Sequence, residues 1–168
     1  MNFLEGLQPI PVPSGKGKSK SNLKKIKLSI IKETTPVFSY RYLSLDSKEF
    51  CYNNPNIDKE DFFKLFEIKK ELSRLTFHAI DNDTKYHFHL VQNEKVNSLL
   101  VKFKSSIKKE FGPGNYELPD IYQFAVYSGT GEDKAPRVFG FIGTKGIFNI
   151  VWLDLYHKVY PATAKRTK

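Results

Sequence analysis

Three apolar runs rich in β-branched and aromatic residues stand close together in the last third of the chain. They cover residues 121–127, 137–142 and 147–153. Glycine and proline occupy the two short gaps between them. Runs of this composition separated by turn residues are typical of neighbouring strands joined by tight connections. The pattern therefore predicts an antiparallel meander of three strands at the C-terminal end of the domain.

Two segments upstream of the meander show helical spacing of apolar residues. Asp58 is a good N-cap, and Glu60 and Asp61 would complement the dipole of a helix that runs to about Arg74. Asn93 is expected to cap a second helix over residues 94–111, which Gly112 and Pro113 end. The buried stripe of this second helix is predicted to consist of Val96, Leu99, Leu100, Phe103 and Ile107.

The N-terminal half carries weaker signals. Residues 26–31 and 36–45 are expected to form two strands around a turn at residues 34–36. Residues 75–80 fit a helix and a strand equally well, and residues 85–91 indicate a short strand or an extended segment. The expected fold class is α+β: two helices packed on an antiparallel sheet, with the C-terminal three-strand meander and mobile basic tails.

Length and charge divide the chain into a body and two tails. The chain has 168 residues and a net charge of +9, which fits one domain over residues 25–161. Residues 1–35 carry seven Lys and two Glu, residues 158–168 carry four basic side chains, and residues 36–157 are neutral with 16 basic and 16 acidic residues. Basic tails attract polyanions without reading their sequence, although they also serve merely as solubilising segments. The nucleic-acid-binding residues predicted in the tails, 1–24 and 162–168, and at the start of the body are Lys16, Lys18, Lys20, Lys24, Lys25, Lys165 and Arg166.

Composition also excludes some classes of protein. Cys51 is the single cysteine, so the chain has neither an intramolecular disulfide nor a cluster of thiolate metal ligands. The first residues do not resemble a signal peptide, and no apolar run approaches the roughly 20 residues that span a bilayer. We therefore expect a cytoplasmic protein that has no membrane partner.

Polar residues of several chemical types follow the last predicted strand. Asp154, His157, Lys158 and Tyr160 lie within seven residues of one another. Histidine is the side chain best suited to proton transfer near neutral pH, a nearby carboxylate can orient it, and a lysine can hold a phosphate. Together with Arg137, which opens the middle strand, these residues predict a catalytic site that needs no metal and no other cofactor.

Each of these residues also has a purely structural interpretation. Asp154 and His157 would then form a turn at the end of a strand. Arg137 would be a solvated or ion-paired residue at an edge of the sheet. Trp152, the only tryptophan, is expected to belong to the core rather than to a stacking platform.

A second candidate site contains two histidines. His87 and His89 would point to the same side of a strand, where both imidazoles are able to share one metal ion. The alternative places both histidines on a solvated face, while Tyr86, Phe88 and Leu90 pack inward. The pair is therefore a subsidiary hypothesis to the metal-free site.

The order of the elements resembles the RelE/ParE-like toxin superfamily. The resemblance covers about residues 58–161: two helices, then strands with Arg137 at the start of the central one, then a strand that leads into His157, Lys158 and Tyr160. It implies a helical pair on an antiparallel sheet and cleavage of mRNA on the ribosome, with those four residues in the site. The chain is similar, too, to small uncharacterised bacterial proteins that share the stretch at residues 72–77 and a final Trp-x-Asp-x-x-His, here residues 152–157.

The leading functional hypothesis is a bacterial toxin of a toxin–antitoxin or phage-defence module, an endoribonuclease that cleaves RNA by acid–base chemistry. His157 would act as acid or base, Asp154 would orient it, and Arg137 and Lys158 would hold phosphate. Its partners would be RNA or the ribosome and an antitoxin protein. Two alternatives remain open: a non-catalytic module that binds nucleic acid and protein, and a metal-dependent nuclease that uses His87 and His89.

Overall fold

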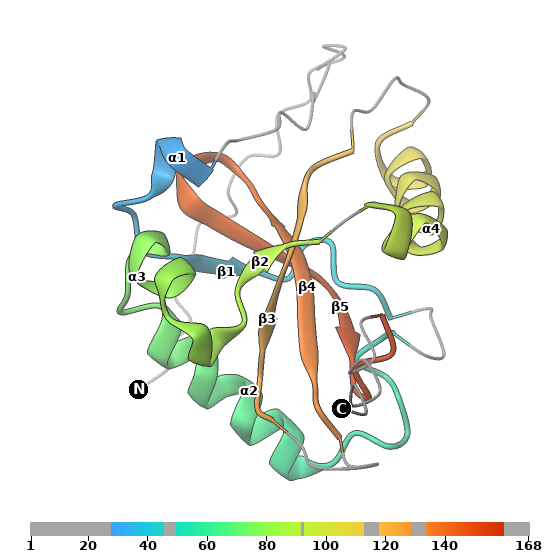
Figure 1. Ribbon diagram of the computed structural model, residues 1–168. Helices are drawn as coiled ribbons and strands as arrows, with labels where there is room; N and C mark the ends of the chain where they lie inside the picture. Colours follow the sequence, from blue (N-terminus) through green and yellow to red (C-terminus); the bar gives the residue numbers. More distant parts are fainter. Residues whose placement is uncertain (1–27, 46–49, 92, 113–117, 129–133, 160–168) are drawn as a thin grey trace, which may run out of the picture.

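A five-stranded sheet forms the centre of the protein (Figure 1). The computed structural model describes residues 28–45, 50–91, 93–112, 118–128 and 134–159. The spatial order of the strands is β1-β5-β4-β3-β2. Their bounds are Val37–Ser39 for β1, His89–Leu90 for β2, Ile121–Ala125 for β3, Arg137–Ile142 for β4 and Ile147–Asp154 for β5.

The predicted meander and the α+β class are confirmed. β3, β4 and β5 pair antiparallel in sequence order, and each begins within the run that predicted it. β2 joins β3 antiparallel at one edge, whereas β1 joins β5 in parallel at the other edge. The sheet is therefore mixed rather than wholly antiparallel.

Helices cover both faces of this sheet. α2 (Lys59–Leu72) and α3 (Phe77–Asn82) bury apolar side chains with Phe124, Val138 and Ile150 on one face. α4 (Asn93–Phe111) packs its predicted stripe against Phe139 and Trp152 on the opposite face. Successive strand residues point to opposite faces, so one sheet supplies two cores. Trp152 lies in the α4 core, as predicted, with 2 % of its surface exposed.

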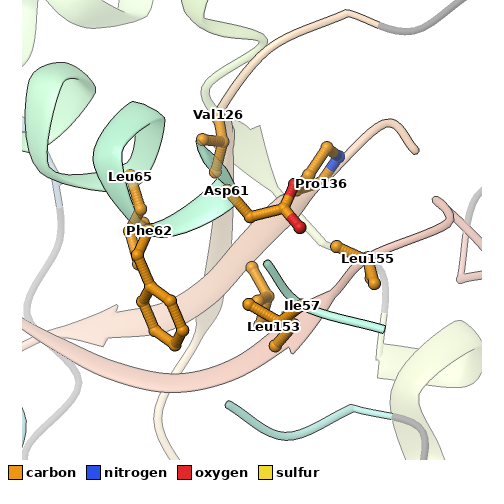
Figure 2. A pocket seen from close by; sticks show the side chains of 8 residues that line it. All are labelled: Ile57, Asp61, Phe62, Leu65, Val126, Pro136, Leu153 and Leu155. Carbon is orange, nitrogen blue, oxygen red and sulfur yellow. The ribbon is translucent and has the colours of Figure 1, made fainter. Parts of the chain in front are cut away.

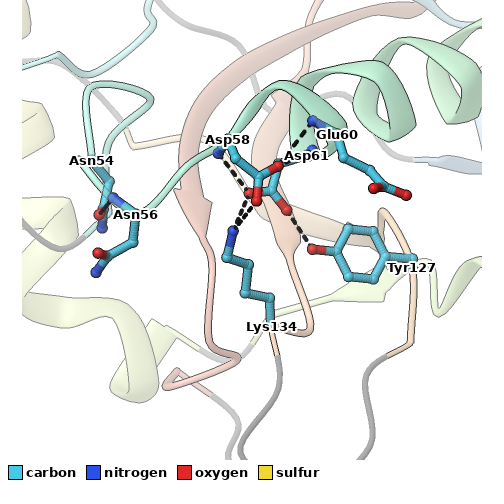
Figure 3. Close-up of polar contacts among 7 residues, drawn as sticks. All are labelled: Asn54, Asn56, Asp58, Glu60, Asp61, Tyr127 and Lys134. Atoms are coloured by element: carbon cyan, nitrogen blue, oxygen red, sulfur yellow. Dashed lines mark hydrogen bonds and ion pairs between the residues drawn. The ribbon is translucent and has the colours of Figure 1, made fainter.

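The amino end of α2 is tied to the sheet by a polar network (Figure 3). The side chain of Asp58 accepts hydrogen bonds from the backbone N–H groups of Glu60 and Asp61. The side chain of Asp61 in turn accepts from the backbone N–H of Asp58, and the two interactions form a capping box. Lys134 Nζ binds Asp58 at 2.8 Å and Asp61 at 2.7 Å, and the Tyr127 hydroxyl donates to Asp61. This confirms Asp58 as the cap and joins it to both ends of the β3–β4 connection.

The strand expected at residues 26–31 is wrong. Leu28–Ile31 is a short helix, α1, and residues 26 and 27 lie outside the described residues. Thr34 closes the turn after it, because both its backbone N–H, at 2.9 Å, and its hydroxyl, at 2.8 Å, donate to the carbonyl of Ile31. A short β-branched run does not distinguish helix from strand, and here the local hydrogen bonds of Thr34 decide.

The other weak predictions resolve into shorter elements. The strand expected at residues 36–45 is only β1, since Leu43 N–H bonds to Tyr40 O at 3.0 Å and turns the chain. The ambiguous segment at residues 75–80 becomes α3, capped by the hydroxyl of Thr76. The expected extended segment at residues 85–91 consists of a 3₁₀ turn, η1 (Thr84–Tyr86), followed by β2. A second such turn, η2 (Thr144–Gly146), joins β4 to β5.

None of the helices in the described ranges combines the length and the apolar character that a bilayer crossing requires.

Candidate active site

Two opposite charges lie side by side in the middle of the sheet. Arg137 on β4 is the register partner of Asp154 on β5 and of Ala125 on β3. Both charged residues point to the α4 face, because they alternate with Val138 and Leu153 of the other core. Only 5 % of Arg137 and 1 % of Asp154 is exposed. Arg137 is thus a buried residue of a central strand, and its structural interpretation as a solvated edge residue is wrong.

A buried glutamine occupies the next row of the same face. Gln123 on β3 pairs with His89 on β2 and with Phe139 on β4. Its Oε1 atom and the Nε atom of Arg137 are both buried and have no hydrogen-bond partner among the described residues. Buried polar atoms are nearly always paired with protein groups or ordered water, so each unpaired one calls for an explanation; a third, the hydroxyl of Tyr52, belongs to the α2 core. The atoms of Gln123 and Arg137 come from neighbouring rows of one face and indicate a polar site there.

Two histidines from distant parts of the chain lie near this polar face. His89 lies on the face through its pairing with Gln123, and His157 follows β5, half-buried. Burial lowers the pKa of His157 below 6.5, the charge of Arg137 lowers it further, and Asp154 opposes the shift. Burial also lowers the pKa of His89; a hydrogen bond with the backbone of His87 opposes this shift, whereas the charges of His87 and Arg137 add to it. Both imidazoles are therefore mainly neutral at pH 7, the form that accepts a proton.

His87 belongs to the same neighbourhood. Its charge, like that of His89, also lowers the pKa of His157, which places all three rings within electrostatic reach of one another. The structure therefore joins two predicted sites that the sequence left separate. We call the group of His87, His89, Gln123, Arg137, Asp154 and His157 the histidine–arginine cluster.

Two members of the cluster have a left-handed backbone. His87 has φ 46° and His157 has φ 54°, a conformation that is uncommon in residues other than glycine. His87 ends η1, and His157 lies in the turn after β5. Such strain costs of order 1–3 kcal/mol and is concentrated at active and ligand-binding sites. That both strained histidines lie in one cluster supports a function for it.

Asp154 and Arg137 make hydrogen bonds other than those that their predicted catalytic roles require. Asp154 Oδ2 accepts from the backbone N–H of Val159 at 2.8 Å, and no hydrogen bond joins Asp154 to His157 in the described part of the chain. Asp154 therefore holds the turn that carries His157 and acts on the ring through its charge. Arg137 Nη1 donates to the carbonyls of Tyr127, Ala135 and Pro136 at 3.0, 3.1 and 3.1 Å, so this nitrogen is already engaged.

An exposed basic and aromatic pair borders the cluster. Lys158 is exposed, and its Nζ lies 5.9 Å from the centre of the Tyr156 ring, which is 37 % exposed. A cation and an aromatic face are the groups that contact a phosphate and a base. Tyr160 and the basic residues predicted to bind nucleic acid, Lys16, Lys18, Lys20, Lys24, Lys25, Lys165 and Arg166, lie outside the described residues.

The two-histidine metal hypothesis loses its geometric basis. β2 begins only at His89, and the left-handed His87 breaks the alternation that would place both rings on one side of a strand. The solvated-face alternative is largely confirmed: His87 and His89 are exposed and Tyr86 and Phe88 are buried, whereas Leu90, 52 % exposed, does not pack inward. Across the described residues, no three or more His, Cys, Asp or Glu side chains gather closely enough to hold a metal ion.

Sequence reasoning missed two members of this region. Gln123 carried a usable signal, because it is a polar residue in the middle of a strand whose other residues are all buried and apolar. Tyr156 carried none, since one aromatic residue after a strand is common. His89 was considered only as a metal ligand, because its position across the sheet from Arg137 depends on strand order.

The apolar hollow beside α2 is not a competing site (Figure 2). It lies on the opposite core, between Phe62 and Leu65 of α2 and Leu153 of β5. Its free space of about 10 Å³ holds roughly one water molecule. Asp61, the one charged residue of its lining, is already bound by Lys134 and Tyr127.

In the described residues, a mixed five-stranded sheet carries the histidine–arginine cluster on its α4 face, where Arg137, Asp154 and Gln123 are buried and His87 and His89 are exposed. Residues 41–168 match the family model described as "Uncharacterised protein UU032", and the chain belongs to that family. The matched range includes every residue of the histidine–arginine cluster. No curated protein and no solved structure matches the chain.

The lowered pKa values predict a loss of stability in mild acid. Histidines of the unfolded chain take up protons near pH 6.5, whereas His89 and His157 in the folded protein become protonated only at a lower pH. The unfolded state thus binds more protons, and the free energy of unfolding falls as the pH drops from about 6.5 through the folded pKa values. Urea denaturation at a series of pH values between about 7.5 and 5 measures this slope. A His89→Gln/His157→Asn double variant should show a flatter slope, and an unchanged slope would assign the acid sensitivity to other groups.

Proposed function

We propose that the protein is an endoribonuclease that cleaves the RNA backbone by acid–base chemistry and without a metal ion. The observation that carries the proposal is the buried Arg137 beside Asp154, with His157 three residues after Asp154 and His89 in the neighbouring row of the same face. Cleavage of this kind needs a base, an acid and a group that offsets the charge developing on phosphate, and two imidazoles and a fixed cation are able to supply them.

The chemistry assigns a role to each histidine. A neutral imidazole takes the proton of the ribose 2′-hydroxyl, the 2′ oxygen attacks phosphorus, and the P–O5′ bond breaks. A protonated imidazole gives its proton to the departing 5′ oxygen, so that a 2′,3′-cyclic phosphate and a 5′-hydroxyl result. DNA lacks the 2′-hydroxyl and is therefore not a substrate. His157 and His89 share these two roles, and the charges of Arg137 and Lys158 offset the negative charge that develops on phosphate.

Arg137 acts in this proposal mainly through its field. Its Nη1 atom is engaged with three carbonyls, so the guanidinium is fixed before any substrate arrives. A cation that does not need to reorient stabilises developing charge more effectively than a mobile one. Direct contact with phosphate falls to exposed Lys158, next to Tyr156.

The cellular role proposed for this activity is that of a toxin in a toxin–antitoxin or phage-defence module. It rests on the resemblance to the RelE/ParE-like superfamily in the order of helices and strands and in the positions of Arg137, His157 and Lys158. RNA or the ribosome would be the target, and an antitoxin protein would restrain the enzyme.

The test is an RNA cleavage assay with the full chain in the presence of EDTA. We expect a labelled single-stranded RNA to be cut to a 2′,3′-cyclic product, and a DNA of the same sequence to stay intact. A His89→Gln variant should lose most of the activity, while His78→Gln, a change of an exposed histidine on α3, should keep it. Cleavage that is lost only when EDTA is added would instead support a metal nuclease. Either that result or the absence of cleavage under all conditions would sink the proposal.

A non-catalytic RNA-binding module is the second candidate. The engagement of Arg137 Nη1 with backbone carbonyls favours it, because an arginine held in this way also serves a structural purpose. Such a module would bind RNA through Lys158, Tyr156 and the basic tails. It would keep its RNA affinity and show no cleavage under any condition of the assay.

A further inference from the structure

α4 is a basic element in a body that is neutral as a whole. Residues 93–111, which form α4, hold five Lys and two Glu, a net charge of +3. Because residues 36–157 are neutral, the rest of that range has a net charge of −3. α2, on the opposite face of the sheet, holds four basic and four acidic residues. The body therefore has a basic side, and that side is also the face of the histidine–arginine cluster.

The lysines of α4 lie outside its buried stripe. Lys102, Lys108 and Lys109 are exposed, and Lys104 is half-buried. Lys104 and Lys108 are one turn apart, whereas Lys102 and Lys109 are two turns apart, so the four form two rows along the helix. Among the side chains that the structure describes, no carboxylate forms an ion pair with Lys104, Lys108 or Lys109. We call these four residues the α4 basic surface.

The helix dipole does not account for the whole of this surface. Lys108 and Lys109 lie in the last turn of α4, where a positive charge complements the dipole. Lys102 and Lys104 precede that turn, and the effect of the dipole is confined to it. Their presence in the middle of the helix points to a negatively charged partner outside the fold.

The basic surface lies on the same side of the sheet as the turn that carries His157. Val159, in that turn, packs against the apolar core that α4 covers, and its backbone N–H donates to Asp154 Oδ2 at 2.8 Å. The turn therefore lies at the edge of this core. Its exposed Lys158 extends the positive charge of α4 toward the end of β5, and Tyr156 beside it is 37 % exposed.

We propose that the α4 basic surface docks the strand of RNA that the histidine–arginine cluster cleaves. Lysines that neutralise phosphates release counterions and bind a polyanion without reading its bases. The exposed face of Tyr156 is able to stack on an unpaired base, which favours a single strand. The substrate is then a single-stranded RNA that extends several nucleotides beyond the scissile bond along α4. The choice of RNA rests on the proposed function, whereas the affinity of the surface is measurable without cleavage.

The test is the affinity of the full chain for a short fluorescent RNA with 2′-O-methyl riboses, which cannot be cut by attack of the 2′ oxygen. Anisotropy at a series of salt concentrations gives the Kd and the slope of log affinity against log salt. Lys104→Gln/Lys108→Gln/Lys109→Gln should weaken binding about tenfold or more at about 0.1 M salt. It should also reduce the slope by about 2, because each phosphate contact on a single strand contributes roughly 0.7.

A matched variant removes the same number of charges from the other side of the protein. Lys32→Gln/Lys59→Gln/Lys70→Gln changes three exposed lysines near α1 and α2. Because charges more than about 10 Å away are largely screened at this salt concentration, its affinity should stay within about twofold of the wild type. An equal loss in both triple variants would overturn the proposal, since net charge alone would then explain binding.

Replacement of the three α4 lysines by arginine keeps the charge and should keep the slope. Thermal melts show whether each variant is folded. Unchanged affinity and slope in a folded glutamine triple variant would overturn the docking surface, whatever the chain cleaves, and would leave α4 free for another partner. RNA that binds as predicted and is never cut in its 2′-hydroxyl form would count against the proposed cleavage alone and would support the docking surface.

Discussion

Replacement of His157 by asparagine should slow the proposed RNA cleavage by about 10²–10⁴-fold, the usual contribution of a general acid or base. Asparagine is the sharpest choice because it keeps a polar side chain and, unlike most residues, tolerates the left-handed backbone found at φ 54°. The variant thus removes titration and leaves the turn intact. Initial rates on a labelled RNA measure the loss, and growth after expression in cells reports on the proposed toxicity.

Two controls make this result specific. The RNA affinity of the His157→Asn variant, measured by fluorescence anisotropy, should stay within about twofold of the wild type if the ring acts in the chemical step rather than in binding. His78→Asn changes an exposed histidine on α3 and should cleave normally. Full activity of a folded His157→Asn variant would mean that His157 has a structural role, and it would favour the binding-module alternative.

Local signals predicted the parts of this fold that depend on neighbouring residues. The three strands of the meander follow from three apolar runs divided by turn residues, and the start of α2 follows from the side chain of Asp58. A helix cap and a tight connection between strands depend on only a few neighbouring residues, so the local sequence is enough to predict them. The apolar stripe of α4 was likewise readable from its spacing.

The rest depends on contacts between distant residues. The segment at 26–31 has a composition that suits a strand, yet Thr34 and the packing of Ile31 make it helical. The parallel pairing of β1 with β5 joins residues more than a hundred positions apart, and no local pattern encodes it. Propensity yields to tertiary context in such short segments.

The candidate site divides in the same way. Arg137, Asp154 and His157 were readable as polar residues around the ends of predicted strands. Their position beside His89 and Gln123 requires the strand order β5-β4-β3-β2 and its register, which place two neighbouring rows of side chains on one face of the sheet. Chemistry was thus predictable one residue at a time, and the assembly of the cluster was not.

The second large effect concerns the stability that Arg137 gives to the fold. Arg137→Met keeps much of the length of the side chain and removes its charge and its donors. Three carbonyl oxygens then lose the Nη1 donor, and Asp154, 1 % exposed, loses its neighbouring cation. Leaving buried polar groups unpaired costs roughly 1–3 kcal/mol for each group. We expect the free energy of unfolding to fall by at least about 3 kcal/mol in urea denaturation.

Asp154→Asn separates the charge from the hydrogen bonds. Asparagine keeps an oxygen for the Val159 N–H and removes the buried negative charge. In the Arg137→Met background, Asp154→Asn should therefore cost less stability than it does alone, and a double-mutant cycle gives the coupling between the two residues. Additive effects would mean that the two charges do not sense each other.

Arg137→Lys completes the argument because it keeps the charge and loses the planar fork of donors. If the field of Arg137 lowers the pKa values of His89 and His157, NMR titration should find them higher in Arg137→Met than in the wild type, and nearly unchanged in Arg137→Lys. The sign follows from charge: a cation disfavours protonation of a nearby imidazole, and its removal relieves that penalty. Equal histidine pKa values in all three proteins would show that Arg137 only holds the β3–β4 connection, and the acid–base site would then lose its electrostatic support.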